Sequence, residues 1–208
     1  RIAGIMTPAG HGYLVLKRFL DLSLIIVTLP VLLPLFLVCA VAIRLESPGP
    51  VVFSQQRTGR NGKRFKMFKF RTMVKNAEEM KAELQHLSIV PWPDFKVPSD
   101  PRITRVGKFL RRSSLDELPQ LINVLIGDMS LVGPRPTSMA LDKYELWHTR
   151  RLDVRPGLTG LWQIEGRNTT TFDERLRLDD RYIRTMSMST DLYILWHTVG
   201  AVLSSKGQ

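Results

Sequence analysis

The amino-acid sequence holds a single cysteine, Cys39, among its 208 residues. One cysteine excludes an internal disulfide framework and a zinc site built from several thiolates. Acidic residues are also few, because 19 Asp and Glu stand against 30 Lys and Arg, which leaves a formal net charge of +11. This excess of positive charge indicates an anionic partner, for which nucleic acid, an anionic membrane surface and a phosphorylated substrate are the candidates.

Several common enzyme signatures are missing as well. The chain has no Gly-x-x-x-x-Gly-Lys-Ser/Thr phosphate loop, no dinucleotide glycine fingerprint, no His-Glu-x-x-His motif and no Gly-x-Ser-x-Gly elbow. The composition, with 44% hydrophobic and 24% charged residues, is nevertheless that of a folded protein. A chain of this length predicts one domain with a core of modest size.

The most apolar part of the chain is Leu22–Ile43, a run of 22 residues without a charge. As a helix it would reach about 33 Å, enough to cross a bilayer core of about 30 Å. Pro30 and Pro34 lie in its middle and predict a kink or a break. Basic residues flank the run on both sides, which favours a cytoplasmic position for both ends: Lys17, Arg18 and Arg44. A straight spanning helix, a re-entrant helix broken near Pro34, a signal peptide and a buried core helix all stay open at this point, although the run is long for a signal peptide.

Positive charge gathers directly after this run. Between Arg44 and Lys75 there are nine basic residues and one acidic residue, Glu46. A basic block next to an apolar run is typical of a membrane-facing arrangement, and it makes nucleic acid the weaker candidate. Residues 101–112 predict a basic amphipathic helix that suits a membrane interface, with an ordinary solvent-exposed helix as the alternative.

The remaining patterns predict helices with a short β element. Val51–Phe53 and Arg64–Arg71 predict two short strands that pair around a turn. Ser114–Ile126 predicts a helix with one apolar face, and Gly127 is a natural C-terminal cap for it. Leu161–Ile164 predicts one further strand. We therefore expect an α+β fold that is mainly helical.

The adjacent carboxylates of Asp116 and Glu117 admit two interpretations. Ser114 and Glu117 have the spacing of a capping box, in which the acids stabilise the start of a helix. Alternatively, the pair holds a divalent cation next to a phosphate, or the Asp116 carboxylate acts as a nucleophile toward phosphorus. An Asp-Glu pair alone does not decide between them.

Residues 115–136, LDELPQLINVLIGDMSLVGPRP, resemble the signature of the bacterial sugar transferases. These are the monotopic polyprenyl-phosphate hexose-1-phosphate transferases, or phosphoglycosyl transferases, that start glycoconjugate assembly. Further blocks that resemble the family occur in family order and extend the match over about residues 17–200: KRF at 17–19 with Asp21, SPGP at 47–50, KFRTM at 69–73, RPGLTG at 155–160 and GRN at 166–168.

The resemblance implies a reaction in two steps. Asp116 would attack the sugar-linked phosphate of a UDP-sugar, release UMP and carry the phosphosugar, which polyprenyl phosphate would then take up. Glu117 would assist through Mg²⁺ or proton transfer, so that Asp116 and Glu117 are the expected metal residues. Arg111, Arg135 and Arg155 are the expected phosphate-binding residues, because a guanidinium matches phosphate oxygens.

The resemblance also implies an organisation of the chain. It comprises an N-terminal segment at 1–16, a re-entrant membrane helix at 17–46 broken near Pro34, and a catalytic domain at 47–208 on the cytoplasmic face of the bacterial inner membrane. Many members have Ser-Pro at the break where this chain has Leu33-Pro34. The expected partners are a UDP-sugar, polyprenyl phosphate and anionic phospholipid, without nucleic acid. The sugar, a homodimer and residues before Arg1 stay open, and a non-catalytic membrane-binding module is the alternative function.

Overall fold

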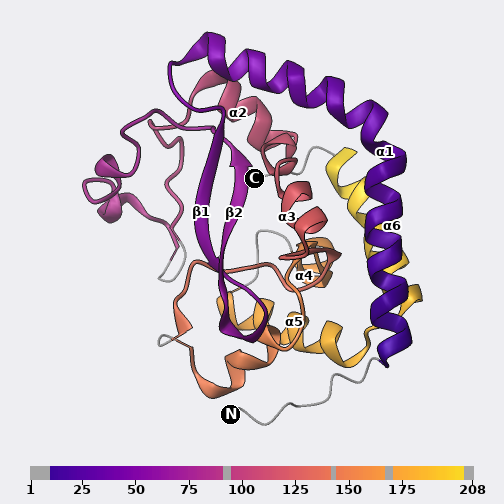
Figure 1. Cartoon of the computed structure of the whole chain (residues 1–208). Helices are drawn as coiled ribbons and strands as arrows, with labels where there is room; N and C mark the ends of the chain where they lie inside the picture. The colour runs from indigo at the N-terminus through magenta and orange to yellow at the C-terminus, as the bar shows by residue number, and fades with distance from the viewer. Residues whose placement is uncertain (1–9, 91–94, 142–143, 167–170, 204–208) are drawn as a thin grey trace.

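The structure, a computed structural model, describes residues 10–90, 95–141, 144–166 and 171–203. Within them the chain is mainly helical with two small sheets, which confirms the expected fold class (Figure 1). In chain order the helices and strands are α1 (His11–Glu46), β1 (Val52–Thr58), β2 (Arg64–Phe70), α2 (Arg105–Arg112), α3 (Gln120–Ile126), β3 (Ser130–Val132), β4 (Gly157–Thr159), α4 (Leu161–Glu165), α5 (Phe172–Arg184) and α6 (Met188–Leu203). Short 3₁₀ turns include η4 (Leu115–Glu117) and η6 (Leu146–Leu152).

Helix α1 is one continuous helix of 36 residues that contains both Pro30 and Pro34. It bends near its middle, so that its first arm lies beside α6 and its second arm runs over α2 (Figure 1). The helical backbone is therefore bent and not broken, contrary to the expected break near Pro34. An interior proline removes a backbone hydrogen bond and bends a helix. The Thr28 hydroxyl, which donates to the Leu24 carbonyl oxygen at 2.7 Å, adds a second known cause of bending.

Buried polar contacts hold the first arm of α1 against the rest of the chain. The carboxylate of Asp191, in α6, accepts hydrogen bonds from Lys17 Nζ and the Tyr13 hydroxyl, both at 2.7 Å, and from the Tyr182 hydroxyl at 2.8 Å. Asp21 accepts two more from residues of β3. Because buried charges are stable only when they are paired, these contacts fix which face of the arm points inward.

Apolar packing and one carboxylate hold the second arm. Cys39 and Ile43 are buried with Phe70 and Leu110 in one apolar cluster. Beyond them, the Glu46 carboxylate accepts hydrogen bonds from the first backbone N–H groups of α2 at 2.7–3.1 Å. Both arms of α1 therefore pack against the same body of protein.

Helix α2 begins at Arg105, later than the predicted start at residue 101. Thr104 caps it, since its hydroxyl oxygen accepts a hydrogen bond from the N–H of Gly107 at 2.9 Å. Asp100, which resembled a helix start, forms a buried ion pair with Arg102 instead, at 2.6 Å. The basic stripe of the helix is thus shorter than the sequence indicated.

The predicted hairpin is confirmed, because β1 and β2 pair antiparallel from Val52 opposite Phe70 to Thr58 opposite Arg64. The predicted strand at Leu161–Ile164 is wrong, since these residues lie in α4.

A second sheet, which the sequence did not predict, pairs β3 with β4 in parallel. Gly157 permits this pairing, because a side chain there would overlap the backbone of Gly133.

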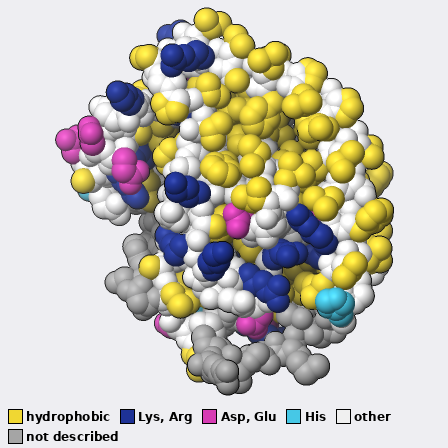
Figure 2. Space-filling model, viewed as in Figure 1, with side chains coloured by type: hydrophobic (Ala, Val, Ile, Leu, Met, Phe, Trp, Pro, Cys, Tyr) yellow, Lys and Arg dark blue, Asp and Glu magenta, His cyan; other side chains and the backbone are white. Residues whose placement is uncertain are grey.

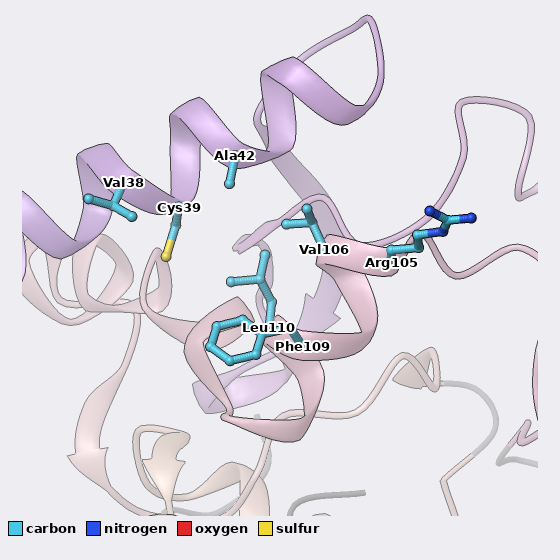
Figure 3. A pocket seen from close by; sticks show the side chains of 7 residues that line it. All are labelled: Val38, Cys39, Ala42, Arg105, Val106, Phe109 and Leu110. Carbon is cyan, nitrogen blue, oxygen red and sulfur yellow. The ribbon is translucent and has the colours of Figure 1, made fainter.

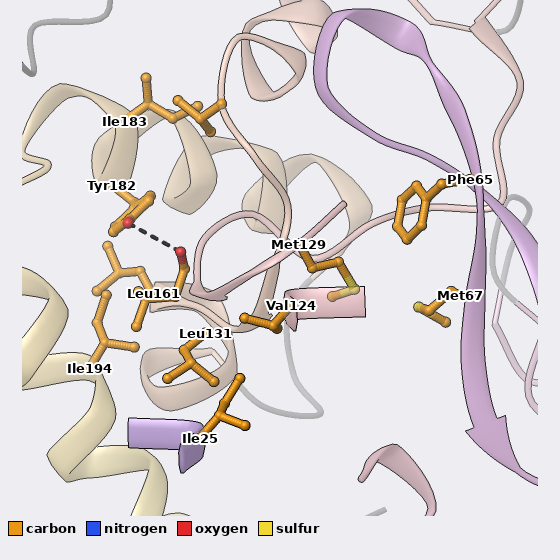
Figure 4. Close-up of a cluster of buried hydrophobic side chains, with 12 residues drawn as sticks. Ile25, Phe65, Met67, Val124, Met129, Leu131, Leu161, Tyr182, Ile183 and Ile194 are labelled. Atoms are coloured by element: carbon orange, nitrogen blue, oxygen red, sulfur yellow. Dashed lines mark hydrogen bonds between the residues drawn. The ribbon is translucent and has the colours of Figure 1, made fainter. Parts of the chain in front are cut away.

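A central cluster of buried apolar side chains joins α1, the hairpin, α3, β3 and the last helices (Figure 4). It is this cluster that brings segments from both ends of the chain together, and its completely buried members include Val124, Met129 and Ile194. The Gly127 cap is confirmed, because Gly127 ends α3 in a left-handed conformation with φ 92°.

Many large apolar side chains remain exposed. Within the described residues, α1 is the helix long and apolar enough to cross a membrane, and only 11% of its most apolar window is buried. Figure 2 shows a broad apolar area over α1, α2 and α3 that borders several Lys and Arg side chains. The exposed apolar residues of α2 and α3 are Phe109, Ile122, Leu125 and Ile126.

Part of the basic block from Arg44 to Lys75 points inward, which corrects the expectation that the whole block faces the membrane. Arg71 is buried and donates to the carbonyl oxygens of Ser47 and Pro48. Its role is to hold the turn after α1 against β2.

Substitution of Asp191 by Asn tests the attachment of the first arm. Asp191→Asn removes the carboxylate that pairs directly with the buried Lys17 ammonium, so we expect the free energy of unfolding to fall by about 3–5 kcal/mol. Urea titration in detergent micelles measures this change. The control is Glu78→Gln, because the Lys81–Glu78 pair is exposed and a pair of that kind contributes about 0–1 kcal/mol. Equal losses of unfolding free energy in the two variants would contradict the role of Asp191 in holding the first arm of α1.

Candidate active site

Asp116 and Glu117 lie in η4, the short turn between α2 and α3. Ser114 precedes it in a left-handed conformation with φ 59°, which turns the chain between the two helices. The Ser114 side chain makes no capping hydrogen bond. The capping-box interpretation is therefore wrong, and the Glu117 side chain is directed elsewhere.

The Glu117 carboxylate binds two basic residues from distant parts of the chain. Lys69 Nζ, on β2, donates to Glu117 Oε1 at 2.8 Å. Arg135 donates to both oxygens, from Nη1 to Oε2 at 3.0 Å and from Nη2 to Oε1. Although burial alone would raise the pKa of Glu117, the charges of Arg135 and Lys69 hold it well below its ordinary value. Glu117 is thus ionised at neutral pH and positions two cations.

Arg135 is itself held in place by its neighbours. It follows Gly133-Pro134 in the loop after β3, where the Pro134 carbonyl oxygen accepts a hydrogen bond from Gly157 N at 2.9 Å. Arg151, from η6, donates to the Arg135 carbonyl oxygen and forms an ion pair with Asp179 at 2.8 Å. These contacts fix the backbone from which the Arg135 side chain extends.

Asp116 has a different environment from that of its neighbour. It is buried, with 9% of its surface exposed, and Lys69 Nζ lies 3.8 Å from its Oδ2. Within the described part of the chain no protein group hydrogen-bonds to its carboxylate oxygens. Burial raises the pKa of Asp116, and the positive charge of Lys69 partly offsets this rise. Its oxygens are therefore available to a substrate.

The three arginines predicted to bind phosphate have different positions. Arg135 lies at the site, as described above. Arg111 lies near Asp116, whose pKa its charge lowers, and its Nε donates to the Thr72 hydroxyl oxygen at 2.9 Å. Arg155 is exposed beside Arg18 and Arg60, and it forms no ion pair with Asp116 or Glu117 among the described residues.

Sequence reasoning missed the position of Lys69 and Arg57, which it assigned to the basic block. Arg57 and Lys69 lie on one face of the hairpin, since their cross-strand partners, Phe65 and Phe53, share that face. Period-2 alternation gives the face of Lys69 within the predicted strand Arg64–Arg71, but Arg57 lies beyond the predicted strand Val51–Phe53, because β1 extends to Thr58. Gln120 is also completely buried near the site, and neither atom of its side-chain amide has a hydrogen-bond partner among the described residues.

An apolar groove of about 360 Å³ lies between the second arm of α1 and α2 (Figure 3). Its lining includes neither Asp116 nor Glu117, so the two carboxylates lie outside it. The lining residues are Val38, Cys39, Ala42, Arg105, Val106, Phe109 and Leu110.

The site contains few potential metal ligands. No group of three or more His, Cys, Asp or Glu side chains gathers within the described residues. Both oxygens of Glu117 are engaged by Arg135 and Lys69, whereas those of Asp116 are not. Mg²⁺ needs only one or two carboxylates when substrate phosphates and water complete its coordination. The residues present fit such an ion, with Asp116 as the available ligand.

Comparison with known proteins identifies the family. The chain matches the bacterial sugar transferase family over residues 12–205 and belongs to it. It is 45% identical to the galactosyl transferase CpsE of Streptococcus agalactiae over 95% of this chain and 44% of that protein. It is 43% identical to the undecaprenyl-phosphate galactose phosphotransferase of Salmonella typhimurium, over 92% of this chain and 41% of the relative.

A shorter relative matches over nearly its whole length. The exopolysaccharide production protein ExoY of Rhizobium meliloti is 39% identical over 98% of this chain and 91% of its own. By contrast, the chain spans less than half the length of the CpsE and galactose phosphotransferase relatives.

The opposite pKa shifts of the two carboxyls predict opposite effects of acid. Because the pKa of Glu117 is lowered in the folded protein, Glu117 stabilises the protein above its ordinary value of 4.5, and this stabilisation is lost as pH falls through the lowered value. The stability of the native protein relative to Glu117→Gln should therefore shrink below about pH 4.5. Urea titrations from pH 7 to pH 3 measure it.

Asp116→Asn is the matched comparison. Because the pKa of Asp116 is raised above 3.8, the native protein should gain stability relative to this variant as pH falls through the raised value. Parallel pH profiles for the two variants would contradict the assigned environments.

Proposed function

We propose that the protein transfers a sugar-1-phosphate from a UDP-sugar to polyprenyl phosphate and releases UMP, as the first membrane step of glycoconjugate assembly. The observation that carries the proposal is the arrangement around Asp116, whose carboxylate oxygens accept no hydrogen bond from the described residues while Lys69, Arg111 and Arg135 lie close by. Membership of the bacterial sugar transferase family supports it. So do relatives named as transferases that act with undecaprenyl phosphate or a lipid carrier.

In the first step, a carboxylate oxygen of Asp116 attacks the phosphorus that carries the sugar. A new bond forms between this oxygen and the phosphorus, and the bond from that phosphorus to the oxygen bridging the two phosphates breaks. UMP leaves with the bonding electrons, and the phosphosugar stays on Asp116. The surrounding cations stabilise the negative charge that develops on the phosphate oxygens.

In the second step, an oxygen of polyprenyl phosphate attacks the same phosphorus. The bond between Asp116 and phosphorus breaks, which frees the carboxylate and gives a polyprenyl diphosphate sugar. Covalent catalysis divides one displacement into two, so both substrates use the same site in turn.

Glu117 has a positioning role in this proposal. Its pKa is lowered and both its oxygens accept hydrogen bonds from Arg135 and Lys69, so it is a poor proton donor. We therefore assign it to holding these two cations beside Asp116 and favour this role over proton transfer. If Mg²⁺ binds, it would neutralise phosphate charge so that the Asp116 carboxylate can approach.

The shape of α1 supports a re-entrant position in the inner membrane, with both ends on the cytoplasmic face. The two arms pack on the same body of protein, through Asp21 and Ile25 in the first and Ile43 in the second. A spanning helix would place one arm beyond the bilayer, away from that body. The exposed apolar side chains of α1, together with those of α2 and α3, would then face acyl chains (Figure 2).

Asp116→Asn tests the nucleophile. With membrane-reconstituted protein, polyprenyl phosphate and Mg²⁺, we expect the variant to release UMP at least about 10³-fold more slowly than the native protein across a panel of UDP-sugars. When acceptor is omitted, label from a radioactive sugar should stay on denatured native protein and be absent from the variant.

The control for this experiment is Glu79→Gln, which removes an exposed carboxylate outside the site. It should keep the native rate. Unchanged activity in Asp116→Asn would overturn the assignment of the nucleophile. No UMP release by the native protein with any UDP-sugar would favour a non-catalytic membrane-binding module.

Cysteine labelling tests the topology of α1. Leu14→Cys and Pro48→Cys, each combined with Cys39→Ala, place one thiol near each end of the helix. Because a re-entrant helix enters and leaves by one face, a membrane-impermeant maleimide should reach both thiols only from the cytoplasmic side of oriented vesicles. Labelling of the two positions from opposite sides would establish a spanning helix instead.

A further inference from the structure

Arg57, on β1, has a charge that no carboxylate neutralises directly. Its Nη2 donates to Gln55 Oε1 at 2.6 Å, but its Nε is buried and has no hydrogen-bond partner among the described residues. In the same part of the chain no carboxylate forms an ion pair with it. Burial and the nearby charge of Arg135 lower its pKa to about 10, and the charge of Glu117 opposes this. Arg57 therefore lies beside the Glu117 cluster without belonging to it.

The other cations of the site are already engaged. Arg135 and Lys69 both donate to Glu117, and Arg111 Nε donates to Thr72. Counted with Arg57, four positive charges surround the two carboxylates, which leaves a net charge of +2. Arg57 is half-buried, and a guanidinium that is partly withdrawn from water next to like charge is costly unless an anion completes its contacts. Arg57 differs from Lys69 and Arg135 in that, among the described residues, no carboxylate accepts a hydrogen bond from it, so its guanidinium keeps hydrogen-bonding capacity for a new anion.

We propose that Arg57 is a phosphate-binding residue, whose guanidinium contacts a substrate phosphate through the N–H groups that its hydrogen bond to Gln55 leaves available. This inference rests on the proposed function. The chemistry suits both a phosphate of the nucleotide sugar and the phosphate of the lipid acceptor, because a guanidinium fork fits either. The alternative is that Arg57 only stabilises the hairpin through its contact with Gln55.

The experiment compares Arg57→Gln and Arg57→Lys with the native protein in membranes. A charge-assisted hydrogen bond to phosphate contributes enough binding energy that Arg57→Gln should raise the KM of one substrate by about 10- to 100-fold. Arg57→Lys keeps the charge but loses the fork, so its KM should lie between the two. A higher KM for the UDP-sugar assigns Arg57 to the donor, and a higher KM for polyprenyl phosphate assigns it to the acceptor.

The matched control is Arg177→Gln, since Arg177 is exposed on α5, outside the site. It should keep both KM values. KM values for both substrates within twofold of native in Arg57→Gln and Arg57→Lys would overturn the proposal. If Arg57→Gln lowers the melting temperature by more than a few degrees, Arg57→Lys decides, and native KM values in that variant overturn it.

A binding measurement separates this proposal from the proposed function. UDP, and separately a short-chain polyprenyl phosphate, should raise the melting temperature of the native protein and of Arg177→Gln. One of the two ligands should lose this effect in Arg57→Gln, even if no UDP-sugar is turned over. That outcome supports phosphate binding by Arg57 while the transferase proposal fails. Equal shifts in all three proteins overturn phosphate binding by Arg57 and leave the transferase proposal to the UMP assay.

Discussion

The carboxylate of Glu117 joins three segments that are far apart in the sequence. It accepts hydrogen bonds from Lys69 on β2 and from Arg135 in the loop after β3, while its own backbone lies in the turn between α2 and α3. Two cations that would otherwise repel each other are held together by one anion between them. This contact also places a positive charge beside Asp116, because the Lys69 ammonium that binds Glu117 lies 3.8 Å from Asp116 Oδ2. Glu117 therefore positions two cations, and the carboxylate oxygens of Asp116 accept no hydrogen bond from the described residues.

The attachment of α1 depends on a similar use of buried charge. An apolar helix has many faces that could pack inward with similar gain, since hydrophobic burial has little directional preference. Lys17 and Asp21 remove this ambiguity, because each has its polar partner on one side only, in α6 and in β3. The second arm is fixed in turn by Glu46, which caps α2. These polar contacts therefore fix one orientation of the mostly apolar helix α1 against the rest of the protein.

Local patterns predicted the elements whose stability is local. The hairpin of β1 and β2, the apolar face of α3 and the Gly127 cap all follow from the spacing of a few neighbouring residues. Predictions failed where a particular side-chain contact or the packing of one element on others decided the outcome. Asp100 resembled a helix start until Arg102 bound its carboxylate, and Leu161–Ile164 has strand-like residues but lies in α4. The parallel pairing of β3 with β4 joins segments more than twenty residues apart, so no local sequence pattern predicts it.

The sequence by itself determined the apolar run with its two prolines, the excess of positive charge and the motif that contains Asp116 and Glu117, because composition and spacing are properties of the chain. From these the family and the candidate nucleophile could be inferred. Only the tertiary structure decided which cations lie around Asp116. Arg57 and Lys69 belong to a basic block that looks uniform in the sequence, and strand pairing turns them toward the site while Lys66 stays exposed. The physical reason is that a charge acts through distance and burial, which the fold sets and the order of residues does not.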